Sequence, residues 1–136
     1  MNPILRRVLA VVTGVVASSL VIMAVEFAGH AVLSGGSLIP DENHEVLLDA
    51  KSLSFEQLVS LLVAWSAGSF VGSYVGIRIA GGAEKMISLL IGAFVLAATV
   101  MNFFQFPHPT WLMVSAIVLI PVASWLAIPR QPKKAT

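Results

Sequence analysis

The side chains of this chain that could do chemistry are a few ionisable and amide groups in or beside long apolar stretches. Glu26, His30 and Asn102 lie inside such stretches, and His108 follows one of them. Glu26 and His30 are four residues apart and therefore share one face of a helix. Charged groups are costly inside a bilayer, so they are candidates for function by default. We take Glu26, His30, Asn102 and His108 as candidate ligand or proton sites.

These side chains are expected at a similar depth. At the standard helical rise, Glu26 lies about 27 Å along the first apolar stretch and Asn102 about 24 Å along the third. Ser60 lies about 28 Å from the far end of the second stretch by the same rise. His108 follows the third stretch directly. The spacing therefore predicts a polar layer close to the outer surface of a membrane.

Several roles stay open for this layer. Glu26 could be a structural lock, hydrogen-bonded to His30 or Asn102, or it could be protonated or wetted at the interface. It could instead be a functional proton, cation or ligand site. A metal ion held by Glu26, His30 and His108, or a haem held by the two histidines, would be special cases of such a site. The Glu-x3-His spacing is not the HExxH motif, and we predict no catalytic residue, metal or cofactor.

Four apolar stretches must position these residues, at 8–33, 58–79, 86–106 and 111–128. Hydrophobic residues make up 57% of the 136 residues and charged residues 11%, against about 25% charged in a soluble domain. About 20 apolar residues cross a bilayer. The composition therefore excludes a soluble globular domain and predicts an all-α, four-helix transmembrane bundle. We expect one transmembrane domain over 1–136, with an outer loop at 34–54 and helices at about 8–33, 55–80, 86–106 and 110–128.

The first stretch resembles the apolar region of a signal peptide, because Arg6 and Arg7 precede it. Its unbroken apolar run, 8–25, is longer than the 7–15 residues usual there, so we predict a retained helix. The chain contains no cysteine, which excludes thiol nucleophiles, disulfides and cysteine-bound metal clusters.

The basic residues predict the orientation of the helices. Seven of the eight lie at helix ends that would share one side of the membrane: Arg6, Arg7, Arg78, Lys85, Arg130, Lys133 and Lys134. Lysine and arginine mark the cytoplasmic side, so both termini are predicted to be cytoplasmic. The net charge of +1 gives no field that favours nucleic acid. The expected partners are the lipid bilayer and a second copy of the chain or a larger membrane complex.

Gly68, Gly72 and Gly76 form a tandem GxxxG motif in the second stretch. In lipid, helices associate through close backbone contact, which glycine permits. A contact with the first or third helix, a homo-oligomer interface and a pore-lining glycine zipper all remain open. The first helix has small residues at the same spacing, which makes it a natural antiparallel partner.

Local signals predict where helices end. Ser54 and Gln57 have the spacing of a capping box, so the second helix should begin near residue 55. Gly81 and Gly82 should end that helix. Pro121 should kink the fourth helix.

Two motifs accompany Glu26 and His30. One is AWSAGSFVG at 64–72, followed by RIA at 78–80, and the other is PHPTW at 107–111. Together they resemble a group of small, uncharacterised four-helix inner-membrane proteins of bacteria. The resemblance covers most of the chain and implies this fold and a multi-pass location in a bacterial inner membrane, but no known activity. The small multidrug transporters also have four helices and a glutamate in the first, but Glu26 lies too near the outer surface, and the outer loop is too long, for close homology.

These features favour a non-enzymatic accessory, assembly or helix-packing subunit. One alternative is a small proton- or cation-coupled transporter or channel with Glu26 as its protonatable site. A second alternative is a membrane enzyme that acts at the outer face through Glu26, His30 and His108.

Overall fold

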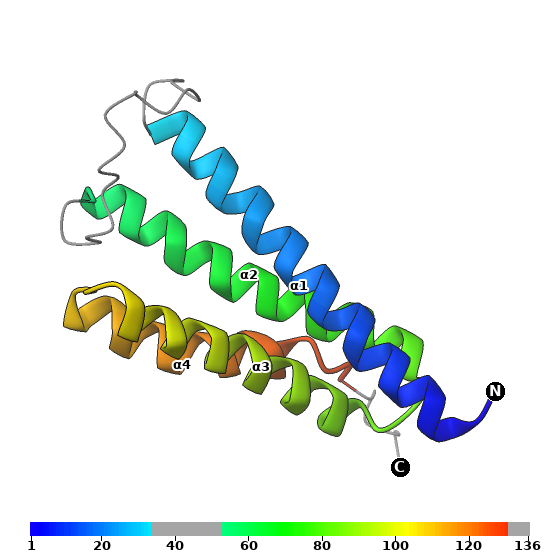
Figure 1. Cartoon of the computed structure of the whole chain (residues 1–136). Helices are drawn as coiled ribbons and strands as arrows, with labels where there is room; N and C mark the ends of the chain where they lie inside the picture. Colours follow the sequence, from blue (N-terminus) through cyan, green and yellow to red (C-terminus); the bar gives the residue numbers. More distant parts are fainter. Residues whose placement is uncertain (34–52, 131–136) are drawn as a thin grey trace, which may run out of the picture.

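The computed structural model describes residues 1–33 and 53–130, which form four helices and no strand (Figure 1). Most of the predicted outer loop, 34–54, lies outside the described residues. The helices are α1 (Pro3–Leu33), α2 (Phe55–Ala80), α3 (Glu84–Gln105) and α4 (Thr110–Leu126). The all-α prediction is confirmed. By length and composition α1, α2 and α3 could each cross a membrane, whereas α4 is apolar but has 17 residues.

Both ends of α2 follow from local chemistry. The Gln57 backbone N–H donates to Ser54 Oγ at 3.3 Å, and the Ser54 N–H donates to Gln57 Oε1 at 2.9 Å. This confirms the predicted capping box. Gly81 ends the helix with a left-handed φ of 62°, which glycine adopts without strain. Arg6 Nε from α1 donates to the Ile79 carbonyl at 2.7 Å, so α1 satisfies a carbonyl that the helix end leaves unpaired.

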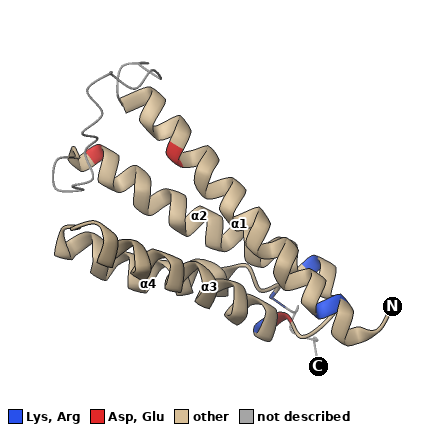
Figure 2. Cartoon of the chain, in the orientation of Figure 1, with Lys and Arg blue, Asp and Glu red and all other residues tan. Residues whose placement is uncertain are grey.

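The described lysines and arginines gather at one end of the helices (Figure 2). We call the end at which the N-terminus lies the termini end, and the opposite end, where α1 finishes and α2 begins, the loop end. In the described part of the chain, every lysine and arginine lies at the termini end: Arg6, Arg7, Arg78, Lys85 and Arg130. Of the described acids, Glu26 and Glu56 lie toward the loop end, whereas Glu84 begins α3 at the termini end, next to Lys85.

Backbone contact joins α1 to α2. A Cβ atom added at Gly72 would come within 2.5 Å of the Gly14 carbonyl oxygen, and one added at Gly14 within 2.7 Å of the Gly72 oxygen. Gly68 and Gly76 approach the α1 backbone one turn to either side, the first at the Ser18 carbonyl. The three glycines of the GxxxG motif therefore form an intramolecular contact, in which α2 packs against α1 of the same chain.

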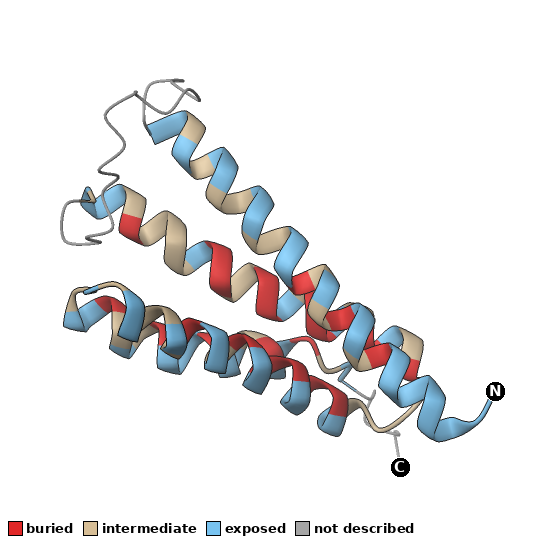
Figure 3. Ribbon diagram, viewed as in Figure 1, coloured by how far each residue is buried: buried red, intermediate tan, exposed pale blue. Residues whose placement is uncertain are grey.

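The buried core is divided along the length of the molecule. The cluster at the termini end comes from α1, α2, α3 and the residue that follows α4: Ala10, Ile77, Ala80, Ile87, Ile91 and Ala127. The cluster at the loop end comes from α2, α3 and α4: Leu58, Trp65, Val95, Leu112, Ala116 and Ile120. From α1 only the partly buried Ile22 packs on it. Figure 3 shows the same division, since the buried part of α1 is its N-terminal half.

Four buried serines, which we call the serine cluster, hold α2, α3 and α4 together. Ser73 Oγ lies 2.6 Å from Ser124 Oγ, and Ser88 Oγ donates to the Ser124 carbonyl at 2.6 Å. Ser124 Oγ also lies 2.7 Å from the Ser88 carbonyl. Ser69 Oγ donates to the Ile120 carbonyl at 3.1 Å. Hydroxyl bonds between helices act as polar glue in an apolar environment, so the serine cluster ties α2, α3 and α4 to one another.

Candidate functional site

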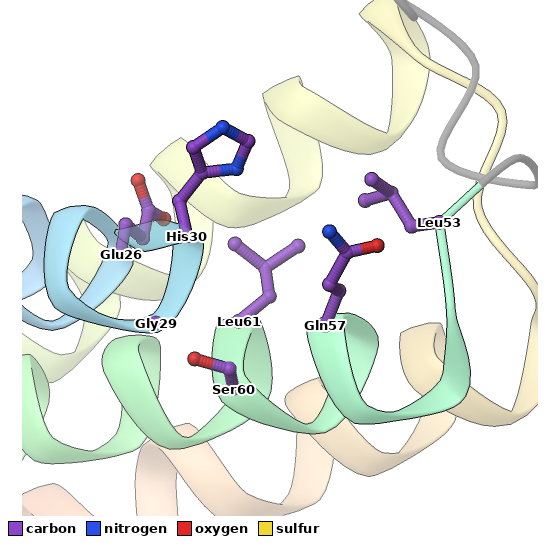
Figure 4. Close-up of a pocket in the computed structure, with 7 residues that line it drawn as sticks. All are labelled: Glu26, Gly29, His30, Leu53, Gln57, Ser60 and Leu61. Atoms are coloured by element: carbon purple, nitrogen blue, oxygen red, sulfur yellow. The ribbon is translucent and has the colours of Figure 1, made fainter. Parts of the chain in front are cut away.

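A cavity of about 280 Å³ lies between α1 and α2 at the loop end (Figure 4). Its polar groups come from Glu26 and His30 of α1 and from Gln57 and Ser60 of α2. Leu61 supplies an apolar wall. The full lining is Glu26, Gly29, His30, Leu53, Gln57, Ser60 and Leu61.

Helical spacing explains how these residues come together. Glu26, Gly29 and His30 recur at intervals of three and four residues, so they share one face of α1. At Gly29 the two helices meet, because an added Cβ would overlap Ser60 Oγ. On α2, Gln57 lies in the first turn, where its side chain caps the helix. The capping box therefore also fixes one polar wall of the cavity.

Glu26 has a partner that the sequence analysis did not foresee. The buried indole of Trp65, on α2, lies beside the Glu26 carboxylate, in position to donate a hydrogen bond to it. Trp65 is 3% exposed, and a buried indole N–H needs an acceptor. The sequence contained a signal for this partner. A tryptophan within an apolar helix needs a hydrogen-bond acceptor for its indole N–H, and that acceptor must lie at the same depth in the membrane. Trp65 therefore adds a contact from α1 to α2, and the expected lock of Glu26 to His30 or Asn102 stays a prediction.

An aromatic cluster continues from Trp65 to the α3–α4 turn. The Trp65 ring packs edge-on against Phe103, with centroids 5.8 Å apart, and lies 6.1 Å from the His108 ring. His108 Nδ1 lies 2.6 Å from the Phe106 carbonyl oxygen. Within the described residues, Trp65 lies beside both His108 and Glu26.

The predicted polar layer is divided in two. Glu26, His30 and Ser60 line one cavity, whereas Asn102 and His108 lie at the end of α3 and in the turn that follows. The Asn102 carbonyl accepts the Phe106 N–H at 3.0 Å. The reason is the course of α1, which diverges from α3 and α4 toward the loop end (Figure 1).

This arrangement limits the chemistry of the site. In residues 1–33 and 53–130, no three histidine or acidic side chains form a group that could hold a metal ion. The metal site considered for Glu26, His30 and His108 is therefore not formed there. What the cavity offers is a carboxylate, an imidazole, an amide and a hydroxyl, which can bind a proton, a cation or a hydrogen-bonding group.

Comparison with known proteins gives no relative. No protein-family model matches the chain, and neither the curated proteins nor the solved structures yielded a match. The resemblance to bacterial inner-membrane proteins stays a prediction that rests on the AWSAGSFVG and PHPTW motifs.

Proposed function

We propose that the chain is a non-enzymatic protein of a bacterial inner membrane that acts as an accessory or assembly subunit of a larger membrane complex. In this proposal the four helices form a transmembrane bundle with both termini in the cytoplasm. The lengths and apolar composition of α1, α2 and α3 support the membrane placement. The lysines and arginines gathered at the termini end support the orientation, because such residues mark the cytoplasmic side.

The observation that carries the subunit role is the exposed face of α1. Leu20, Met23 and Phe27 are each more than 60% exposed and lie on one face of the helix, since they are three and four residues apart. In this half of α1, Ile22 alone reaches the core of the other helices. A helix of a partner protein could pack here and complete the bundle at the loop end.

In this account Glu26 is a structural residue. Its bond to Trp65 joins the outlying half of α1 to α2, close to the exposed face. Interhelical hydrogen bonds contribute about 0.6–2 kcal/mol in membrane proteins. Such a bond would set the angle at which α1 meets its partner.

Photo-crosslinking in intact cells tests the subunit role. A photoreactive residue in place of Phe27 should give an adduct with one protein of defined mass. The control is the same probe at Val118, an exposed residue of α4, which should give lipid adducts. Lipid adducts alone at Phe27 would reject the role, and an adduct of twice the chain's mass would replace the larger complex with a homo-oligomer.

A second candidate is proton- or cation-coupled transport through the Glu26 cavity. The observation that favours it is the set of polar groups that share the cavity with this carboxylate, namely His30, Gln57 and Ser60. Purified protein in liposomes should then carry a proton or cation flux that Glu26→Gln abolishes. Equal leak rates in liposomes with wild-type protein, with the variant and with no protein would exclude this candidate.

A further inference from the structure

A second hollow lies between α3 and α4. Its volume is about 350 Å³, and its lining includes Lys85, Ser88, Gly92 and Ala93 from α3 and Pro121, Ser124 and Trp125 from α4. We call it the α3–α4 groove. The groove exists because small or compact residues, Gly92, Ala93 and Pro121, face it where long side chains would fill it.

The floor of the groove is held in place by bonds behind it. Ser88 and Ser124 belong to both the groove and the serine cluster, and Ser88 Oγ donates to the Ser124 carbonyl at 2.6 Å. At Gly92 an added Cβ would lie 2.6 Å from Ser124 Oγ, so α3 and α4 touch there. The groove is therefore formed before any occupant enters it.

The length of the groove matches one leaflet of a bilayer. From Lys85 to Leu96, α3 advances about 16 Å at the helical rise. Half of a hydrocarbon core of about 30 Å has the same length. Lys85 and Trp125 lie toward the termini end, and tryptophan prefers the level of the lipid headgroups. Between this end of the groove and Leu96, the side chains that line it are apolar except for Ser88 and Ser124.

We propose that the α3–α4 groove binds one acyl chain of an anionic phospholipid, with the lipid phosphate paired to the Lys85 ammonium. The inference rests on the membrane placement proposed above. Charge complementarity selects this occupant, since all described lysines and arginines lie at this end of the molecule. Glu84 is next to Lys85 in sequence, but consecutive helical residues do not face each other. A straight acyl chain also fits a narrow groove whose two helices are already in contact at its floor.

Native mass spectrometry of the detergent-purified full chain tests the headgroup preference. Phosphatidylglycerol and phosphatidylcholine with identical acyl chains serve as probes. We expect phosphatidylglycerol to bind about fivefold more tightly, which corresponds to about 1 kcal/mol for one basic residue at an anionic surface. Lys85→Gln should remove this preference. Arg78→Gln, which removes an exposed positive charge of α2 at the same end, should leave it unchanged.

A substitution that fills the groove tests the position of the acyl chain. Ala93→Leu should weaken the binding of both lipids at least fivefold. Ala98→Leu is the matched control, because Ala98 is exposed on α3 outside the groove, and it should change nothing. Equal affinity of the wild type for both lipids, or unchanged binding by Ala93→Leu, would overturn the proposal. Lipid binding is measured on purified protein in micelles, and this measurement depends neither on the orientation of the helices in a cell membrane nor on a partner protein. A negative result would therefore reject the lipid site without rejecting the proposed function.

Discussion

Gly72→Ala is the sharpest perturbation of the α1–α2 contact, because the two competing effects of this substitution have opposite signs. In a helix interior, alanine is more favourable than glycine by about 0.5–1 kcal/mol. If Gly72 faced lipid, Gly72→Ala would therefore raise the free energy of unfolding. In the structure a Cβ at Gly72 would lie 2.5 Å from the Gly14 carbonyl oxygen and would overlap Ser18 Oγ.

The size of the effect follows from the distance that α1 must move. Ordinary van der Waals contact for a Cβ atom begins near 3.4 Å, so the two backbones must separate by about 0.9 Å. A serine hydroxyl can rotate away, but the Gly14 carbonyl belongs to the backbone and moves only with its helix. Overpacking of this kind costs about 1–3 kcal/mol. We expect Gly72→Ala to lower the free energy of unfolding by that amount, and Gly72→Leu to lower it further.

Reversible unfolding in mixed micelles measures this free energy. Gly29→Ala is the comparison, since an added Cβ there meets only the Ser60 side chain in the outlying half of α1, which can shift more easily. It should cost less than Gly72→Ala. A Gly72→Ala variant that is as stable as the wild type, or more stable, would refute the backbone contact.

Three further outcomes are expected. A cysteine in place of Asn43 should be labelled from outside intact cells and one in place of Lys134 only after permeabilisation, because the basic residues predict cytoplasmic termini; external labelling at 134 would contradict the orientation. Ser88→Ala should lower the free energy of unfolding by about 1–2 kcal/mol in the same micelle titration, because it removes a bond between α3 and α4. Arg6→Gln should lower it by about 0.5–1.5 kcal/mol, because the Ile79 carbonyl loses its donor.

The last two predictions have matched controls in the chain. Ser19 is exposed and bonds only within its own helix, to the Val15 carbonyl, so Ser19→Ala should change stability by less than about 0.5 kcal/mol. Arg7→Gln removes an exposed charge next to Arg6 and should also be close to neutral. If either control costs as much as its partner variant, the assigned hydrogen bond does not explain the loss.

Local signals in the sequence were sufficient for the two ends of α2, whereas α1 begins at Pro3, five residues before the predicted start at about residue 8. The capping box at Ser54 and Gln57 and the glycine at 81 depend on residues within one turn of each other, so spacing alone specifies them. The spacing of Gly68, Gly72 and Gly76 also indicated a face made for close packing, although it left open which helix would occupy that face.

The candidate site was harder to predict, because depth arithmetic gives a position along a helix and not the direction in which a side chain points. It placed Asn102 level with Glu26, yet the divergence of α1 from α3 separates them. It also gave no weight to Trp65, which counts as a hydrophobic residue but has an indole N–H that needs a hydrogen-bond acceptor when it is buried. The bonds between Ser73, Ser88 and Ser124 join three helices, and no spacing within one helix encodes them.

The measurement that tests the account most directly is the photo-crosslink at Phe27 repeated in Glu26→Gln and Trp65→Phe backgrounds. If Glu26 ties α1 to α2 beside a partner's binding face, Glu26→Gln should preserve the protein adduct, because a glutamine oxygen can still accept the indole N–H. Trp65→Phe removes that donor and should weaken or displace the adduct. The account would be contradicted if Phe27 gave no protein adduct in the wild type. It would also be contradicted if Glu26→Gln lost the adduct while its unfolding free energy stayed the same, because the charge of Glu26 would then matter rather than its bond.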